Sequence, residues 1–116
     1  MIKNYLETTK QAMDSSHDGS GPVDLYEIWE KSDFLSNIDF VDRVVIPPRS
    51  TVGTHRHGDN EEMYIVLSGT ADMTIEGKAV TVRKGDMILN PPNGEHGLQN
   101  NSDDDIDLLV IQVALT

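Results

Sequence analysis

The sequence contains no cysteine among its 116 residues. Disulfide bonds, thiolate nucleophiles, iron–sulfur clusters and cysteine-based zinc sites are therefore excluded, because each of them requires a thiol. Basic residues are also few, with nine Lys and Arg against twenty Asp and Glu and a formal net charge of −11. This excess of negative charge opposes binding to nucleic acids and to anionic membrane surfaces, which are polyanions themselves.

Long apolar runs are missing as well. No stretch approaches the roughly 20 apolar residues of a membrane-spanning helix, and the first residues, Met1 to Tyr5, lack the basic start and apolar stretch of a secretion signal. The sequence therefore predicts a soluble, cytoplasmic protein with no nucleic-acid or membrane partner. Its length fits one domain, and a hydrophobic fraction of 37% can support one modest core.

Turn-forming residues divide the chain into a short N-terminal part and a series of strands. Residues 2–13 carry apolar side chains three or four apart and predict one helix, and residues 15–22 predict a loop rich in Ser and Gly. The candidate strands that follow are 24–29, 40–46, 62–68, 71–76, 79–82, 86–89 and 107–115. Their short and even spacing predicts an all-β sandwich or barrel over residues 23–116, preceded by an extension over residues 1–22.

Histidines give the main functional signal. His55 and His57 are separated by one residue, and such residues share one face of a strand, about 6.6 Å apart. Two imidazoles at this spacing can both reach one metal ion at about 2.1 Å. Glu62 follows a turn at the start of the next strand, and His96 follows a Pro-rich turn. These side chains are either ligands of one metal ion, such as Fe, Mn, Zn, Ni or Cu, or ordinary surface and hydrogen-bonding residues.

The spacing around these residues resembles the two motifs of the cupin family. The first motif is Gly, five residues, His-x-His, three or four residues, Glu, six residues and Gly, and residues 49–69 follow it. The six-residue gap before Gly69 selects Glu62, and not Glu61, as the ligand position. The second motif is Gly, five residues, Pro-x-Gly, two residues, His, three residues and Asn, matched by Gly85, Pro91, His96 and Asn100.

Two positions depart from the family pattern, since Arg49 and Asn93 stand where the motifs have Gly. Asn tolerates a left-handed backbone better than most residues, and Arg49 affects only the geometry of its own turn. The resemblance implies a single-domain cupin jelly-roll β-barrel with a short N-terminal helix or extension. It also implies one divalent transition metal ion (Fe, Mn, Zn or Ni) with the ligands His55, His57, Glu62 and His96.

The same resemblance implies an ion inside the barrel with one or two coordination positions open to water, as in a catalytic site. A small oxygenated metabolite, such as a hydroxy acid, diketone, enediol or sugar, could chelate there. The implied function is a mononuclear metal-dependent enzyme of the dioxygenase, isomerase or epimerase, decarboxylase, or dehydratase or cyclase type. The alternatives are a non-catalytic small-molecule-binding or sensor cupin and, ranked last, a storage or structural protein.

Three further residues are candidates for catalysis or substrate binding. Tyr64 is in phase with Glu62 along one strand and should stand beside the metal, unless it serves packing alone. Arg43 is a charged residue within an apolar strand, either an anion clamp or a salt-bridged residue. Gln112 is the polar residue of an otherwise apolar last strand and could face the cavity.

The remaining expectations concern the surroundings of the barrel. Asn100 should fix the loop next to the third histidine through backbone hydrogen bonds. His17 lies in a Gly-rich segment and is expected to be solvent-exposed, unless this segment folds over the barrel mouth. We also expect a homodimer, because an isolated small jelly roll exposes sheet edges and apolar faces.

Overall fold

The computed structural model describes residues 1–14 and 19–116. This part of the chain forms two antiparallel β-sheets, one with the order β1-β2-β3-β10-β5-β8 and one with the order β4-β9-β6-β7. The strands are β1 (Lys10–Asp14), β2 (Pro22–Glu30), β3 (Ile38–Ile46), β4 (Thr51–Arg56), β5 (Asn60–Ser68), β6 (Thr70–Ile75), β7 (Lys78–Arg83), β8 (Met87–Asn90), β9 (Glu95–Gln99) and β10 (Ile106–Ala114). The short 3-10 turns η1 (Tyr5–Glu7) and η3 (Lys31–Asp33) precede β1 and follow β2.

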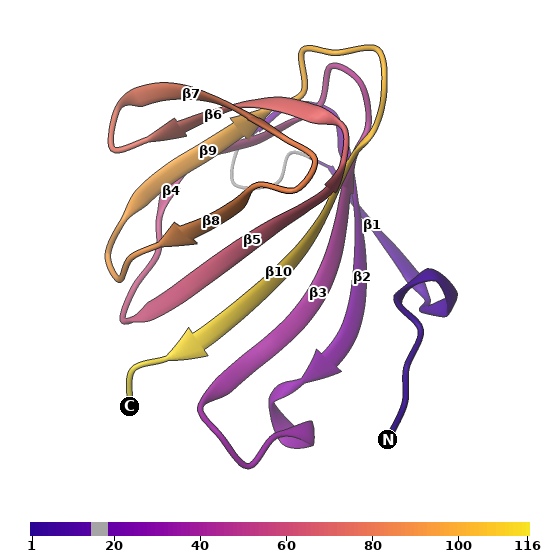
Figure 1. Ribbon diagram of the computed structural model, residues 1–116, viewed down its shortest axis with the longest axis vertical. Coiled ribbons are helices and arrows are strands. Elements are labelled where there is room, and N and C mark those ends of the chain that lie inside the picture. Colours follow the sequence, from indigo (N-terminus) through magenta and orange to yellow (C-terminus); the bar gives the residue numbers. More distant parts are fainter. Residues whose placement is uncertain (15–18) are drawn as a thin grey trace.

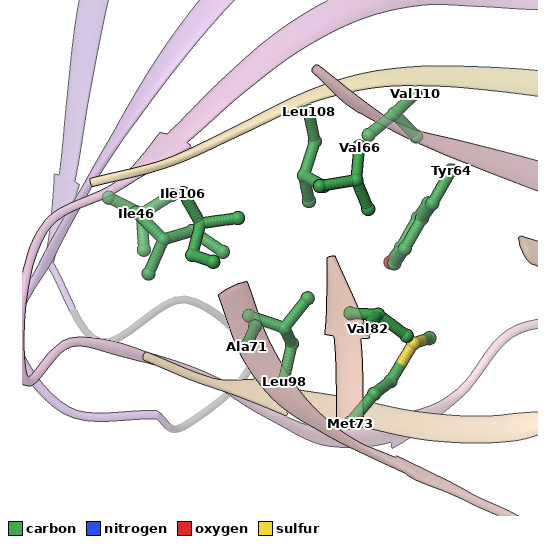
Figure 2. Close-up of a cluster of buried hydrophobic side chains, with 11 residues drawn as sticks. Ile46, Tyr64, Val66, Ala71, Met73, Val82, Leu98, Ile106, Leu108 and Val110 are labelled. Carbon is green, nitrogen blue, oxygen red and sulfur yellow. The ribbon is translucent and has the colours of Figure 1, made fainter. Parts of the chain in front are cut away.

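The two sheets face each other and enclose the core. Figure 1 shows β2, β3, β10 and β5 side by side in one layer, with β4, β9, β6 and β7 in the other. Every second residue of β10 points inward, so that Ile106, Leu108 and Val110 are buried. Figure 2 shows these side chains meeting Ala71, Met73, Val82 and Leu98 from the opposite sheet. Burial of each large apolar side chain contributes about 1.5–3 kcal/mol.

The all-β double-sheet fold predicted from the sequence is confirmed. Each of the predicted strands overlaps an observed one, because alternating apolar residues between turn formers are a reliable signal for half-buried strands. Among the described residues, no helix has the length and apolar character that crossing a bilayer requires. His17 and the first part of the expected loop lie outside the described residues. The division into an extension over 1–22 and a barrel over 23–116 stays a prediction.

The predicted helix over residues 2–13 is wrong. Only Tyr5–Glu7 form a 3-10 turn, capped by the Asn4 side chain, and Lys10–Asp14 form β1, which pairs antiparallel with β2. The apolar stripe that suggested a helix has no surface to cover, since Ile2 and Leu6 are exposed. A short helix without a buried face is marginal in water, whereas pairing with β2 satisfies the backbone groups of this segment.

The sequence did not predict β4 and β9 as strands. Yet β4 carries His55 and is followed directly by His57, and β9 carries His96. Both are short and rich in Gly, His and polar residues, which are weak strand formers. They pair because Gly97 lets them approach closely: a Cβ at this position would lie 2.7 Å from the Thr54 hydroxyl. A glycine is therefore needed where the two histidine-bearing strands come together.

The two motif positions that depart from glycine keep the backbone that glycine would adopt. Arg49 has φ 68° and Asn93 has φ 58°, both in the left-handed region. The Arg49 guanidinium donates hydrogen bonds to the Asn101 carbonyl and the Asp103 carboxylate, and both donor–acceptor distances are 2.6 Å. These contacts offset part of the conformational cost of a left-handed non-glycine residue.

Candidate metal centre

Three strands from two sheets bring the candidate ligands together. His55 on β4 is the register partner of His96 on β9, and their ring centroids lie 4.5 Å apart. Glu62 comes from β5 in the other sheet, so the group spans the interior of the barrel. Side chains far apart in the sequence thus meet because their strands face each other across the core.

The donor atoms of this group lie close to the spacing of a metal site, so that small side-chain movements would bring them onto one ion. One ligand atom from each of His55, Glu62 and His96 can be chosen so that all lie within 4.8 Å of one another. Two ligands at about 2.1 Å from one ion lie at most about 4.2 Å apart. Both Glu62 and His96 are buried, which favours a defined site over a loose surface cluster.

Hydrogen bonds orient His55 and His57. The Nδ1 atom of His55 lies 2.9 Å from the Gly53 carbonyl oxygen, and Nδ1 of His57 lies 2.8 Å from the Asn60 side-chain oxygen. An oxygen acceptor selects the tautomer with the proton on Nδ1 and leaves the lone pair on Nε2 for a metal. The Nε2 atom of His57 is buried without a hydrogen-bond partner among the described residues.

His57 stands slightly apart from the other three ligand candidates. Its ring centroid lies 5.1 Å from that of His96, and its donor atoms are not in the compact group of three. A buried nitrogen without a partner costs free energy unless something binds it. The geometry of His57 therefore fits a fourth ligand that completes the site when an ion binds.

Glu62 is held as a carboxylate. Its Oε1 atom is buried, lies 3.4 Å from Nε2 of His96 and accepts no well-formed hydrogen bond from the described residues. Burial by itself would raise the pKa of Glu62, but the contact with His96 and the proximity of His57 and His55 outweigh it and lower the pKa. A deprotonated, inward-facing carboxylate is the form that binds a divalent cation.

Tyr64 stands beside the histidines, as its phase with Glu62 predicted. Its hydroxyl lies 3.1 Å from Nε2 of His96, and the side chain projects from β5 toward the opposite sheet (Figure 2). Burial and the nearby Glu62 carboxylate raise the pKa of the Tyr64 phenol. The phenol therefore keeps its proton and is available as a hydrogen-bond donor.

A cavity of about 150 Å³ adjoins this group. Its polar side chains are Asp42, Glu62, Tyr64 and His96, and the Gly97 backbone also borders it. The rest of its wall is apolar and consists of Val23, Leu25, Phe40, Val44, Ile46, Val52, Leu98, Leu108 and Val110. A mostly apolar cavity with a few convergent polar groups is typical of a small-molecule site.

Arg43 and Gln112 each bind an acidic side chain, although Gln112 is also the register partner of Glu62. The Arg43 guanidinium donates two hydrogen bonds of 2.9 Å to the Asp107 carboxylate and packs against Tyr26. The Gln112 amide donates to the Asp39 carboxylate over 2.9 Å. Neither side chain lines the cavity. Of the two roles expected for Arg43, an anion clamp or a salt-bridged residue, these contacts correspond to the second.

Two polar residues of the interior were missed by sequence reasoning. Asp42 lines the cavity, and its buried Oδ1 atom has no hydrogen-bond partner among the described residues. Asn90 is fully buried, and neither its side-chain oxygen nor its side-chain nitrogen has a hydrogen-bond partner among the described residues. It is the register partner of Glu62 on the neighbouring strand. Alternation places Asp42 on the strand face of Phe40 and Val44, but Arg43 shares the other face with the apolar Val41 and Val45, so the pattern does not tell which face is the inner one.

Asn100 secures the turn that follows β9. Its amide donates to the backbone carbonyls of Ile46 and Asp104, and its side-chain oxygen accepts from the Ser102 backbone and hydroxyl. The side chain is completely buried. It thus ties the loop after the His96 strand to the end of β3, as a supporting residue should.

Replacing Asn100 with Ala is expected to destabilise the fold by about 1–3 kcal/mol, because buried backbone groups lose their partners. Urea unfolding measures this loss. The neighbouring Asn101 is exposed, with its amide bonded to the Asp72 carboxylate, so the matched Asn101→Ala change should cost no more than about 0.5 kcal/mol. Equal losses for the two variants would contradict this role of Asn100.

A small barrel of two antiparallel sheets, with imidazole and carboxylate groups converging on an internal cavity, defines the class of this protein. The family model of the cupin domain matches residues 42–112. The chain belongs to the cupin family.

Similar proteins cover the chain almost completely. The oxalate-binding protein of Thermotoga maritima is 25% identical over 99% of this chain and 95% of its own length. A crystal structure of a predicted oxalate decarboxylase from Thermotoga maritima superimposes with a TM-score of 0.95 at 25% identity, over 99% of this chain and 100% of the other. The mannose-1-phosphate guanylyltransferase of Escherichia coli is 26% identical over 96% of this chain, which spans only 23% of that protein.

Proposed function

We propose that this protein is a mononuclear metal-dependent cupin enzyme that acts on a small oxygenated metabolite. The ligands would be His55, His57, Glu62 and His96, and the ion would be Fe, Mn, Zn or Ni. Within this proposal, dioxygenase, isomerase or epimerase, decarboxylase, and dehydratase or cyclase activities share the same ligand set. The fold does not select among them, because the chemistry depends on the pocket.

The observation that carries the proposal is the convergence of two buried donors and one half-buried donor beside the cavity. The His55, Glu62 and His96 donors lie within 4.8 Å of one another. The buried Nε2 of His57 and Oε1 of Glu62 lack hydrogen-bond partners among the described residues. A mixed set of nitrogen and oxygen donors suits a divalent transition metal.

An ion at this site would supply a Lewis acid that polarises a substrate oxygen. The chain's own residues have separate roles. Tyr64 keeps its proton and can donate a hydrogen bond to a substrate oxygen, since its hydroxyl already lies beside the ligand group. The apolar wall around it excludes water, which strengthens each polar contact inside the cavity.

The second candidate is a small-molecule-binding protein without catalysis. The two names found in Thermotoga maritima point in both directions, because the curated sequence is called oxalate-binding and the crystal structure is called a predicted oxalate decarboxylase. A binding protein would hold its ligand unchanged, whereas an enzyme would release a product. Mass analysis of the ligand after incubation with metal-loaded protein separates these candidates.

Metal analysis of protein purified without chelators tests the ligand set. We expect about one divalent ion per chain in the wild type, and a loss of at least about tenfold in affinity for His57→Ala, because a ligand is removed. His17→Ala is the matched control, since it removes the remaining histidine of the chain. Equal metal content in wild type and His57→Ala would rule out His57 as a ligand.

Oxygen uptake by the iron-loaded protein, with diketones and hydroxy acids as trial substrates, then tests the dioxygenase type.

The homodimer and the cytoplasmic location stay predictions. Light scattering of the purified protein measures the mass of the particle and decides between a monomer and a dimer.

A further inference from the structure

We infer that Asp42 is a specificity-determining residue that recognises a hydroxyl group of the ligand and rejects a second carboxylate. The inference rests on the proposed function, because the ligand would bind the metal through its other end. It assigns the substrate class as small hydroxy acids or polyols with at most one acidic group. A ligand that places a second carboxylate next to Asp42, in contrast, should bind poorly.

The position of Asp42 supports this role. It lies in the middle of β3 between Phe40 and Val44, and all three side chains line the cavity. The Oδ1 atom is buried and has no hydrogen-bond partner among the described residues. A buried carboxyl oxygen without a partner is costly, so a hydrogen-bond donor on the ligand would stabilise both the complex and this side chain.

The charges around the cavity favour a neutral group at this end. Among the residues that the structure describes, no Lys or Arg lines the cavity, and the acidic side chains on its wall are Asp42 and Glu62. Arg43, the next residue along β3, is bonded to Asp107 and does not face the cavity. On the neighbouring strand β2, Glu27 is the register partner of Asp42 and adds negative charge.

A ligand carboxylate next to Asp42 would therefore meet like charge with no cation beside it, and like charges in a low-dielectric interior repel strongly. Tyr64 and His96 are the other titratable groups on the cavity wall, and they contact each other rather than Asp42. A ligand hydroxyl can donate a hydrogen bond to Oδ1 without this penalty. The cavity of about 150 Å³ limits the ligand to roughly the size of benzene.

Three probes that differ at one end test this inference. Lactate, glycerate and hydroxymalonate share a carboxylate and an α-hydroxyl for the metal, and end in a methyl, a hydroxymethyl and a carboxylate group. Calorimetric titration of Zn²⁺-loaded protein measures their affinities. It is done at about pH 8, because burial raises the pKa of Asp42 to about 7 and its carboxyl is mostly ionised above that value. We expect glycerate to bind at least about tenfold more tightly than hydroxymalonate, with lactate between them.

The Asp42→Asn variant should raise the ratio of hydroxymalonate affinity to glycerate affinity at least about tenfold, because it removes the charge and keeps the shape. The matched control is Asp39→Asn on the same strand. The Asp39 carboxylate binds Gln112 and Lys31 and does not line the cavity, so this change should leave the ratio unaltered. The order of the probes in the wild type is a second test, which does not depend on the variant folding.

Hydroxymalonate binding as tightly as glycerate in the wild type, an unchanged ratio in Asp42→Asn, or binding of none of the probes would overturn the inference. Zinc content is measured before each titration. Failure to retain zinc overturns the proposed function, whereas stoichiometric zinc with any of these binding results overturns the role of Asp42 alone.

Discussion

Replacing His96 with Ala is expected to abolish the stabilisation that a divalent metal ion gives this protein. His96 is completely buried, and it contacts the other ring, carboxylate and phenol groups of the site. Its loss removes an imidazole ligand and leaves the Glu62 carboxylate without its nearest partner. The affinity for Zn²⁺ should fall at least about 100-fold, since loss of outer-shell partners alone costs about 10–100-fold.

Thermal unfolding with and without Zn²⁺ measures this effect. Free metal at about 100 times its dissociation constant stabilises a binding protein by about 2.7 kcal/mol, so the wild type should melt at a higher temperature when zinc is added. His96→Ala should show no such shift. The comparison is between the two shifts and not between the two melting temperatures, because the variant also loses packing. An equal zinc-induced shift in the variant would exclude His96 as a ligand.

The sequence predicted the members of this site better than the strands that hold them. The resemblance to the cupin motifs selected His55, His57, Glu62 and His96, and the structure brings His55, Glu62 and His96 together in one compact group. It did not predict β4 or β9, because strands made of Gly, His and polar residues lack the apolar alternation on which strand prediction depends. The cupin motifs are recognisable without that alternation, because they are defined by the spacing of Gly, His, Glu and Pro residues along the chain.

The interior charges show why the cavity was harder to predict than the ligands. Sequence reasoning selected Arg43 as the charged residue of β3, but this side chain pairs with Asp107. Its neighbour Asp42 faces the cavity instead. Alternation tells which residues share a face, but the identity of the inner face depends on which sheet covers it. That information is non-local, and the apolar residues on both sides of β3 gave no local indication.

The N-terminal segment also shows that a local sequence pattern lacks information about tertiary contacts. Residues 2–13 have helical spacing, yet Lys10–Asp14 form β1 because the edge of β2 offers backbone partners there. Local propensity is a weak signal, and tertiary pairing overrides it when the apolar stripe finds no surface to cover. All-β content was predictable from the rest of the chain, where the alternation is regular.

Replacing Asp42 with Asn is expected to stabilise the metal-free protein at high pH. Burial, together with the charges of Glu27 and Glu62, raises the pKa of Asp42 from 3.8 to about 7 in the folded protein. A raised pKa means that the protonated form is favoured by folding. Its contribution to stability is complete below about pH 4 and is lost as the pH rises through about 7. The amide of Asn stays neutral throughout.

The difference in unfolding free energy between Asp42→Asn and the wild type should therefore grow from about pH 4 to about pH 7 and reach a plateau above about pH 8. The plateau should be smaller than a full conversion at about 1.4 kcal/mol per pKa unit would give, because Asp42 is only partly buried and solvent screens the charges around it. Urea unfolding in the presence of a chelator, at several pH values, measures it. The general loss of stability from the net charge of −11 affects both proteins and cancels in the difference.

Asp39→Asn is the control, and its effect on stability should depend on pH in the opposite direction. Hydrogen bonds from Gln112 and Lys31 lower the pKa of Asp39, so its contribution to stability is present above the unfolded pKa and is lost as the pH falls. This variant should be less stable than the wild type near neutral pH and should approach it in acid. Parallel stability curves for Asp42→Asn and wild type would mean that Asp42 titrates in the folded protein as it does in the unfolded chain. The buried carboxyl would then have a solvated environment, and its proposed selection of ligands by charge would lose its physical basis.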